Sequence, residues 1–388
     1  MRIFKDKDDF CRDRAFDEQC IYYRALYSHP WQMESVQPAS VNLQQRAGAR
    51  TGYFPEGNKT RDYIRNASCR FEIRQTPSGQ SYVVSLPEPG LVPCPTTYLG
   101  SITGTLFDYP LSSLASIHHA LTSETASLVR RVASRPRQSI GLFNEPFSNV
   151  LLPDNFLSLL EEYFPGLRGE YPEHPLFIRG LIGGQHLPAF RQLRQMGFFL
   201  IPYRRIFLFQ ETSEKNCSKH MKQDLARLQK YRDAVSCPQE PLPNVDYEVM
   251  VALYRKLYLG KYSFLNPDYT PSFLREMHCQ GRLRLMICRN STGEIFGFSG
   301  CTRQGNRMNA NLVGHNREMM PGLSAYLLTN AAEAEYALQN DCVINFGAGA
   351  QKFKLSRGCI PDYEYIAMYV PPISLLRGVR DLVRSLQV

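Results

Sequence analysis

The most informative stretch of this chain reads Asn345-Phe346-Gly347-Ala348-Gly349-Ala350-Gln351-Lys352-Phe353-Lys354-Leu355-Ser356-Arg357-Gly358. It lies between two strand-like runs, residues 342–344 and 364–370. Pairs of small residues allow the backbone to turn sharply or to approach a ligand closely. Two lysines and an arginine follow, so the segment offers backbone N–H groups and cations to an anion or to a developing oxyanion. The alternative interpretation is a structural strand-to-helix turn with surface lysines.

Four groups of residues around this turn carry a resemblance to a known fold. They are the small residues 347–350, Phe353-Lys354, Arg357-Gly358 and Glu364-Tyr365. The segment resembles the end of the GNAT-type acyltransferase fold, in the branch related to the Fem aminoacyl transferases. The resemblance spans residues 139–370 and implies a mixed α/β protein. It also implies that the preceding strands and helices are a degenerate first copy of the GNAT fold.

Length and composition bound the architecture. A chain of 388 residues, 43% of them hydrophobic, is long for one typical domain and can bury sizeable cores. We expect an accessory region over residues 1–135, a degenerate GNAT-like half over 136–212 and a GNAT-like transferase domain over 213–388. No run of residues reads as a membrane span or a signal core. The sequence therefore predicts a soluble cytoplasmic protein with no membrane partner, and it leaves the oligomeric state open.

Cysteine spacing and charge narrow the choice of partners. The 11 cysteines are scattered, without a Cys-x-x-Cys pair, so we expect reduced thiols and no metal site. The net charge of +9 favours a polyanionic partner, although it is also compatible with plain solubility.

Positive charge is densest over residues 215–233. Met221, Leu225 and Leu228 recur there at helical spacing and predict a buried stripe. The cations of the same segment are Lys215, Lys219, Lys222, Arg227, Lys230 and Arg232. Because lysine and arginine dominate affinity for phosphates, we expect this helix to bind tRNA. The alternative is a solvated helix face without a ligand.

Strand-like and helix-like segments alternate along the chain, which favours a mixed α/β fold. In the first part we expect strands over 139–143, 174–179, 197–202 and 205–209, the last two separated by a bend, and helices over 111–133, 155–164 and 187–196. In the second part we expect strands over 282–289, 295–302, 307–314 and 342–345, and helices over 247–259, 271–279 and 322–340. The second series has the order of the GNAT core.

The loop before the long helix indicates which molecule donates the acyl group. In acetyl-CoA-using GNAT enzymes this loop carries small residues that hold a pyrophosphate. Here it spans residues 315–322, and Met319, Met320 and Pro321 replace the small residues. The Fem-like branch, which takes its aminoacyl group from tRNA, also often lacks that loop. We therefore expect no tightly bound cofactor, aminoacyl-tRNA as the favoured donor, acyl-CoA as the alternative, and a small-molecule amine as acceptor. A non-catalytic RNA-binding protein on the same fold is a third interpretation.

Candidate site residues follow from their position in this pattern. Acyl transfer to an amine needs a general base and a stabilised oxyanion. Lys354 and Arg357 are candidates for the oxyanion or a donor phosphate, and Glu364 or His315 for the base. The substrate-binding candidates are Lys261, Tyr262, Asn266, Asn345, Gly347 and Gly349. A larger side chain at Gly349 is expected to crowd the turn. Each candidate has a structural alternative, as an exposed cation, an ion-pair partner or a loop residue.

Overall fold

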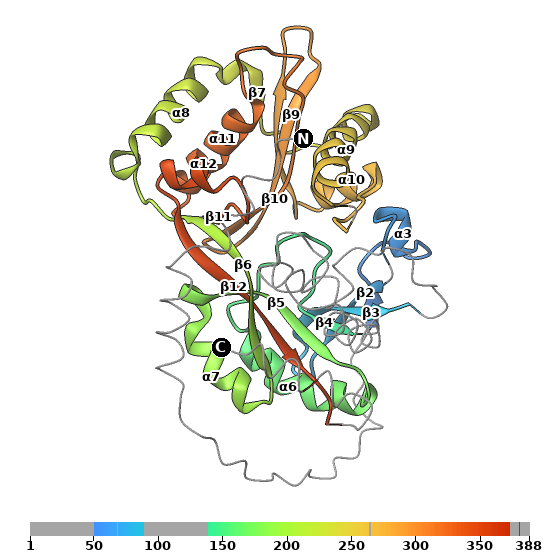
Figure 1. The fold of residues 1–388 in the computed structure, drawn as a ribbon. Helices are drawn as coiled ribbons and strands as arrows, with labels where there is room; N and C mark the ends of the chain where they lie inside the picture. The colour runs from blue at the N-terminus through green and yellow to red at the C-terminus, as the bar shows by residue number, and fades with distance from the viewer. Residues whose placement is uncertain (1–49, 68, 89–138, 264, 373–379, 381–388) are drawn as a thin grey trace, which may run out of the picture.

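One mixed sheet runs through the part of the protein that the structure describes. The computed structural model describes residues 50–67, 69–88, 139–263, 265–372 and 380 (Figure 1). The helix expected over residues 111–133 lies outside these ranges. In chain order the strands are β1 (Arg50–Gly52), β2 (Cys69–Gln75), β3 (Ser81–Pro87), β4 (Ile140–Leu142), β5 (Leu176–Ile182), β6 (Phe199–Phe209), β7 (Val235–Ser236), β8 (Arg284–Arg289), β9 (Ile295–Gln304), β10 (Arg307–His315), β11 (Val343–Asn345) and β12 (Ile360–Tyr369). Across the sheet the order is β1-β2-β3-β4-β5-β12-β6-β11-β10-β9-β8-β7.

Helices cover this sheet in two lobes. They are α3 (Thr60–Tyr63), α6 (Phe156–Glu170), α7 (Gly183–Gln195), α8 (Lys219–Lys230), α9 (Asn244–Leu257), α10 (Pro271–Cys279), α11 (Ala325–Gln339) and α12 (Gln351–Ser356). In the upper lobe of Figure 1, α8, α11 and α12 lie on one side of β9 and β10, and α9 and α10 lie on the other. The lower lobe carries α6 and α7.

The order of elements occurs twice. The series β2, β3, β4, α6, β5, α7, β6 is matched by β8, β9, β10, α11, β11, α12, β12. In each series three antiparallel strands are followed by a helix and by a strand parallel to the third one. The mixed α/β fold and the expected duplication of a GNAT-type unit are thereby confirmed. The first unit begins with β2 and β3, which lie within the region predicted to be accessory, residues 1–135. The predicted division of the chain into three domains stays a prediction.

The two copies exchange their last strands. β6 of the first copy pairs with β11 of the second, and β12 of the second copy pairs with β5 of the first. β6 and β12 pair with each other in antiparallel orientation at the centre of the sheet. In Figure 1 the red strand β12 accordingly crosses into the green lower lobe. The copies therefore share one continuous sheet.

The structure of β6 corrects one expectation. The sequence predicted two strands separated by a bend, whereas the chain forms one strand, Phe199–Phe209. Its pairing with β12 shifts register between Pro202 and Arg204, which leaves Tyr203 as an extra residue. Proline has no N–H for the ladder, and a bulge accommodates it without ending the strand.

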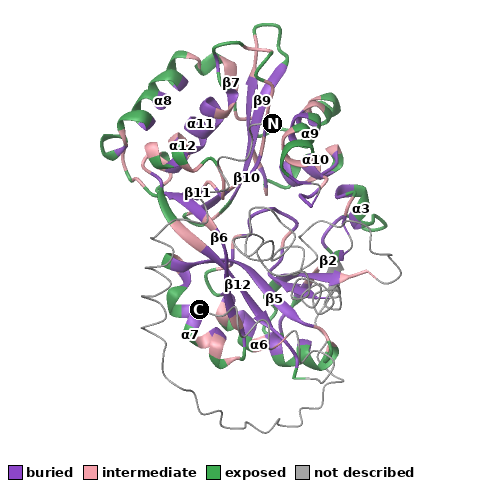
Figure 2. Ribbon diagram, in the orientation of Figure 1, coloured by how far each residue is buried: buried purple, intermediate pink, exposed green. Residues whose placement is uncertain are grey.

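Burial and capping explain where the helices form. Strands β5, β6 and β12 are largely buried, whereas α8 exposes one face (Figure 2). The predicted stripe of Met221, Leu225 and Leu228 is buried, as expected. α8 begins after Ser218, whose hydroxyl accepts the Met221 N–H, and α11 begins after Ser324, which caps its helix in the same way.

Candidate functional site

The second copy opens where β10 and β11 separate. The two parallel strands pair only through residues 307–309 and 343–345. β10 continues to His315, whereas β11 ends and the chain turns into α12. Asn149 of the first copy lies in this opening. Its Nδ2 donates to the carbonyl oxygen of Ala310 at 2.8 Å, and its N–H donates to Oδ1 of Asn311 at 2.7 Å.

The turn between β11 and α12 has three residues with positive φ. The φ angles are 68° at Gly347, 79° at Gly349 and 49° at Ala350. Asn345 accepts the Gly347 N–H on its Oδ1 at 2.7 Å and so holds the start of the turn. The expected crowding at Gly349 is wrong, because a Cβ there would meet no atom within 4 Å. The left-handed backbone, rather than lack of space, favours glycine at this position.

Lys354 lies beneath this turn, with a relative exposure of only 3%. Its Nζ donates to the carbonyl oxygens of Phe346, Gly347 and Ala348 at 2.7, 2.9 and 3.0 Å. Burial lowers the pKa of its amine to about 7. In this arrangement the cation contacts the protein's own backbone.

Arg357 connects α12 to α8. Its Nε donates to Oδ2 of Asp224 at 2.8 Å, and its guanidinium carbon lies 3.6 Å from the centre of the Phe353 ring. The Ser218 hydroxyl also donates to the carbonyl oxygen of Ser356 at 2.9 Å. Two contacts therefore fasten the cationic helix to the segment that follows the turn.

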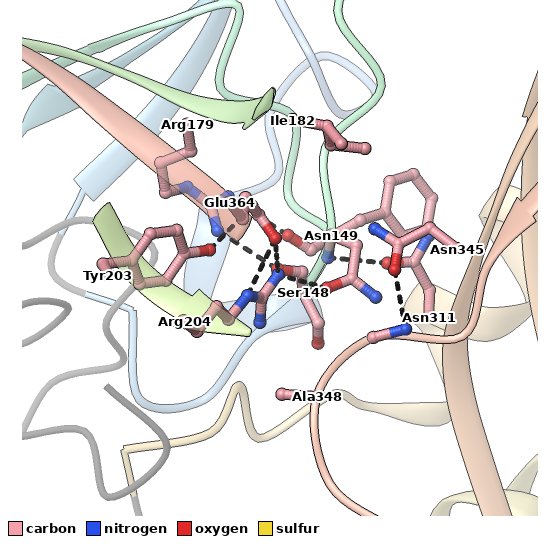
Figure 3. A network of polar contacts seen from close by, with 12 residues as sticks. Ser148, Asn149, Arg179, Ile182, Tyr203, Arg204, Asn311, Asn345, Ala348 and Glu364 are labelled. Carbon is pink, nitrogen blue, oxygen red and sulfur yellow. Dashed lines mark hydrogen bonds and ion pairs between the residues drawn. The ribbon is translucent and has the colours of Figure 1, made fainter. Parts of the chain in front are cut away.

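Glu364 lies at the centre of the molecule in a buried polar network (Figure 3). Tyr203 donates its hydroxyl to Oε1 at 2.7 Å, and Arg204 donates its Nε to Oε2 at 2.8 Å. Arg204 also donates to Oδ1 of Asn149. Both carboxylate oxygens of Glu364 thus accept hydrogen bonds from side chains of β6, and the network reaches the residue that fills the opening.

A second buried arginine fastens the loop that carries Asn149. Arg179 on β5 donates to Oδ1 of Asn144 at 2.8 Å. It also donates to the carbonyl oxygens of Phe147 and Ser148 at 3.1 and 3.2 Å. The position of Asn149 in the opening therefore depends on side chains from both copies.

Cationic and aromatic side chains gather where β10 ends and α11 begins. The ring of Tyr326 lies 5.9 Å from that of His315 and 5.0 Å from that of Phe353. Lys261 and Arg317 are close enough to His315 to act on its charge, and Tyr262 is 50% exposed nearby. We call this set the mouth cluster: Lys261, Tyr262, His315, Arg317, Tyr326 and Phe353.

His315 is the candidate base in the mouth cluster. Burial lowers the pKa of its imidazole, and the charges of Arg317 and Lys261 lower it further. Both effects favour the neutral form of the ring. Its Nδ1 is buried and has no hydrogen-bond partner within the described part of the chain. A neutral imidazole with an uncommitted nitrogen has the chemistry that a general base requires.

The structure brings together only some of the predicted site residues. His315, Lys261 and Tyr262 meet in the mouth cluster, while Lys354 lies under the turn and Glu364 at the molecular centre. Asn266 is buried, and its Nδ2 donates to the carbonyl oxygens of residues 258 and 263 at 3.1 and 3.0 Å. It thereby holds the π-helical segment Tyr258–Tyr262, which carries the two mouth residues.

The predicted cationic helix presents its charges to solvent. Lys219, Lys222, Arg227 and Lys230 are exposed on α8, and Lys215 and Arg232 are exposed in the short turns that flank the helix. Lys222 donates its Nζ to the carbonyl oxygen of Lys215 at 2.7 Å, Lys230 lies 5.4 Å from the centre of the Tyr231 ring, and Arg232 pairs with Glu335. The surface is basic, and its ligand stays a prediction.

Sequence reasoning missed three residues of this region: Asn149, Tyr326 and Glu333. Tyr326 and Glu333 are seven positions apart in a helix, which places them on the same face. This spacing is the signal from which both could have been predicted as neighbours in this region. Glu333 is 1% exposed, and burial raises the pKa of its carboxyl to about 8, against the opposing effects of Ser299 and Lys354. No local signal identifies Asn149, because its partners Arg204, Ala310 and Asn311 all lie far away in the chain.

Comparisons with known proteins return structural likeness alone. No family model and no curated protein matches the sequence. Among solved structures, L-PGS from Bacillus licheniformis aligns with a TM-score of 0.46 and 10% identity, over 83% of this chain and 90% of that one. FemX aligns with a TM-score of 0.41 and 10% identity, over 86% and 90%. A tandem GNAT protein from the clavulanic acid biosynthesis pathway aligns with a TM-score of 0.37 and 11% identity, over 80% and 85%. Because these TM-scores lie below 0.5, the fold assignment rests on the strand order described above.

Two further kinds of feature are absent from the described residues. None of their helices combines the length and the apolar composition needed to cross a bilayer. Nor do the described residues contain a group of three or more His, Cys, Asp or Glu side chains arranged to hold a metal ion.

Proposed function

We propose that this protein transfers an acyl or aminoacyl group from an activated ester to a small amine, with His315 as general base. The observation that carries the proposal is the imidazole of His315, with its lowered pKa and unpartnered Nδ1, at the end of β10, beyond the residues that pair with β11. Lys261 and Arg317 beside it supply positive charge for an anionic substrate group. Tyr326 and Phe353 supply apolar surface for the rest of the substrate.

The residues of the site suit a direct transfer. The amine nitrogen attacks the ester carbonyl carbon, the C–N bond forms, and the carbonyl electron pair moves to oxygen. His315 accepts the proton that the attacking nitrogen loses. When the oxyanion collapses, the ester bond breaks, and the leaving oxygen or sulfur takes up the proton from His315, which returns to its neutral form. Positioning and electrostatic stabilisation account for this reaction, so no covalent nucleophile is required.

Aminoacyl-tRNA is the donor that we favour. The exposed cations of α8 suit a polyanion. The loop before α11 packs Met319 and Met320 against an apolar cluster instead of presenting paired small residues to a pyrophosphate. Acyl-CoA is the alternative donor.

The test supplies purified protein with charged tRNA or with acetyl-CoA, together with a panel of small amines, and follows the loss of each ester. We expect ester loss that depends on tRNA and on an amine. His315→Gln should lower turnover about 10²–10⁴-fold. His174→Gln is the matched control, because that ring also has a lowered pKa and a buried, unpartnered Nδ1 within the described residues. Turnover with acetyl-CoA alone would overturn the choice of donor.

The same assay separates catalysis from binding. If His315→Gln and wild type lose ester at the same rate, His315 is not the base. If tRNA binds tightly but neither ester is consumed with any amine, the protein is an RNA-binding protein on a transferase fold, and the transfer proposal fails.

A further inference from the structure

The guanidinium of Arg357 is held by groups from two helices. Its Nε donates to Oδ2 of Asp224 at 2.8 Å, and its Nη1 donates to the hydroxyl of Ser356 at 2.9 Å. Nη1 also donates to the carbonyl oxygen of Phe353 at 3.4 Å. Only 14% of the arginine side chain is exposed. A guanidinium with these contacts has little freedom to turn toward a substrate.

The same guanidinium covers one face of the Phe353 ring. Its carbon lies 3.6 Å from the ring centre, the shortest distance between a cation and a ring in the described part of the chain. Residues four positions apart lie on the same face of a helix, which is why Phe353 and Arg357 meet. An arginine lies flat on an aromatic ring in this way, whereas the ammonium of a lysine is a compact point charge. The contact therefore depends on arginine at this position.

Asp224 explains why Arg357 is held there. The carboxylate lies on the buried face of α8, with a relative exposure of 5%. A buried carboxylate is costly without a charged partner, so losing the ion pair with Arg357 would be unfavourable. α12 has only six residues, too few for a stable helix on its own, so its side chains depend on such contacts. α8 therefore fixes the position of Arg357.

The Phe353 ring in turn contacts the mouth cluster. Its centre lies 5.0 Å from that of the Tyr326 ring, which lies 5.9 Å from that of His315. Both distances are in the range of direct contact between aromatic rings. A continuous series of contacts therefore joins Asp224 on α8 to the candidate base.

We infer that Arg357 is a positioning residue, which holds the Phe353 ring as a fixed wall of the mouth cluster and is itself fixed by Asp224. It acts on the substrate through this ring and does not touch the substrate. The effect of Arg357 on transfer rests on the proposed function. The position of the ring in the free protein does not.

The first experiment needs neither donor nor acceptor. Full-length protein is labelled with 13C in the histidine rings, and the Cε1–H resonance of His315 is identified by its absence in His315→Gln. Arg357→Lys keeps a cation beside Asp224 but loses the flat contact with Phe353. Asp224→Asn keeps the shape of the side chain but removes the charge that fixes Arg357. We expect both changes to shift the His315 resonance, because displaced aromatic rings alter the chemical shift of a neighbouring group.

The matched control is Arg284→Lys. It removes a guanidinium that lies 4.0 Å from the centre of the Tyr336 ring, on the same helix as Tyr326. The His315 resonance should be unchanged in this variant. An unchanged resonance in Arg357→Lys or in Asp224→Asn would overturn the inference, and so would an equal shift in the control. If Arg357→Lys does not fold, Asp224→Asn decides.

A second measurement links the wall to transfer, once a donor and an acceptor are established. Arg357→Lys should lower kcat/KM about 10²-fold, the cost of misplacing a substrate by about 1 Å. In a Phe353→Leu background the same change should have almost no further effect, because the ring through which it acts is gone. Effects that add in the double variant would mean that Arg357 contacts the substrate directly and would overturn the inference. Failure to find any donor would count against the proposed function, but it would leave the resonance shifts intact.

Discussion

Glu333 is a buried acid whose protonation affects stability. Its pKa is 4.5 when unperturbed and about 8 in the folded protein, because burial penalises the carboxylate. Between these values the folded state binds more protons than the unfolded state, so stability falls as the pH rises from 4.5 to 8. Relative to wild type, Glu333→Gln should gain up to about 1.4 kcal/mol per pH unit across that window.

Chemical unfolding of both proteins as a function of pH measures this difference. Glu335→Gln, two positions along the same helix, is the control, because Glu335 is only half-buried and pairs with Arg232. Parallel stability curves for wild type and Glu333→Gln would show that the carboxyl is ionised in the folded state throughout the window.

The sequence identified several residues of the site but little of what they contact. The small-residue turn and the lysine beyond it were visible as a motif, and the positive φ angles at Gly347 and Gly349 explain why glycine occurs there. The partners of Arg357 and Glu364 were not visible, since Asp224 and Arg204 lie far away in the chain. The sequence does not show how deeply each side chain is buried. A lysine is therefore interpreted as a surface cation until the carbonyl groups around it are known.

At the scale of single elements, the exposed face of α8 is the surface that we expect to bind RNA. Reversing Lys222 and Lys230 to glutamate should weaken tRNA binding. It should also reduce the slope of log Kd against log salt concentration by about 2. Neither residue belongs to the buried stripe of the helix, so the fold should be retained.

Binding titrations at several salt concentrations measure both quantities. Lys256→Glu is the control, because this exposed lysine lies on α9, across the sheet from α8. An unchanged affinity and slope in the double variant would leave α8 as a solvated face.

Most elements were predictable because their signals are local. The helix expected over residues 271–279 is α10, with Thr270 as its cap and Pro271 in its first turn. The break predicted in β6 was wrong. Considered without the rest of the fold, Pro202 and Arg204 suggest a bend. In the folded protein, a bulge accommodates the proline, and Glu364 on the facing strand pairs with the arginine.

At the scale of the whole molecule, the exchanged strands make the two copies interdependent. A fragment of residues 1–212 lacks β12, the strand that lies between β5 and β6 in the sheet. A fragment of residues 213–388 lacks β6, the strand with which both β11 and β12 pair. We expect neither fragment alone to unfold cooperatively, and the two mixed together to regain a cooperative transition.

Calorimetry of each fragment and of their mixture tests this interdependence. A cooperative transition in the isolated C-terminal fragment would show that the second copy is stable without its partner. The exchange itself could not be predicted from sequence, since the pattern of a strand says which face is buried and not which distant strand lies beside it.

The position of β12 in the sheet has a consequence for synthesis. During translation β6 emerges long before the strand that will cover its edge. Until then the nascent chain presents an unpaired edge flanked by apolar side chains, a typical starting point for aggregation. Closing the sheet also requires contacts between segments far apart in sequence, which slows folding. We therefore expect release of active protein to lag behind completion of the chain, and chaperones to raise its yield.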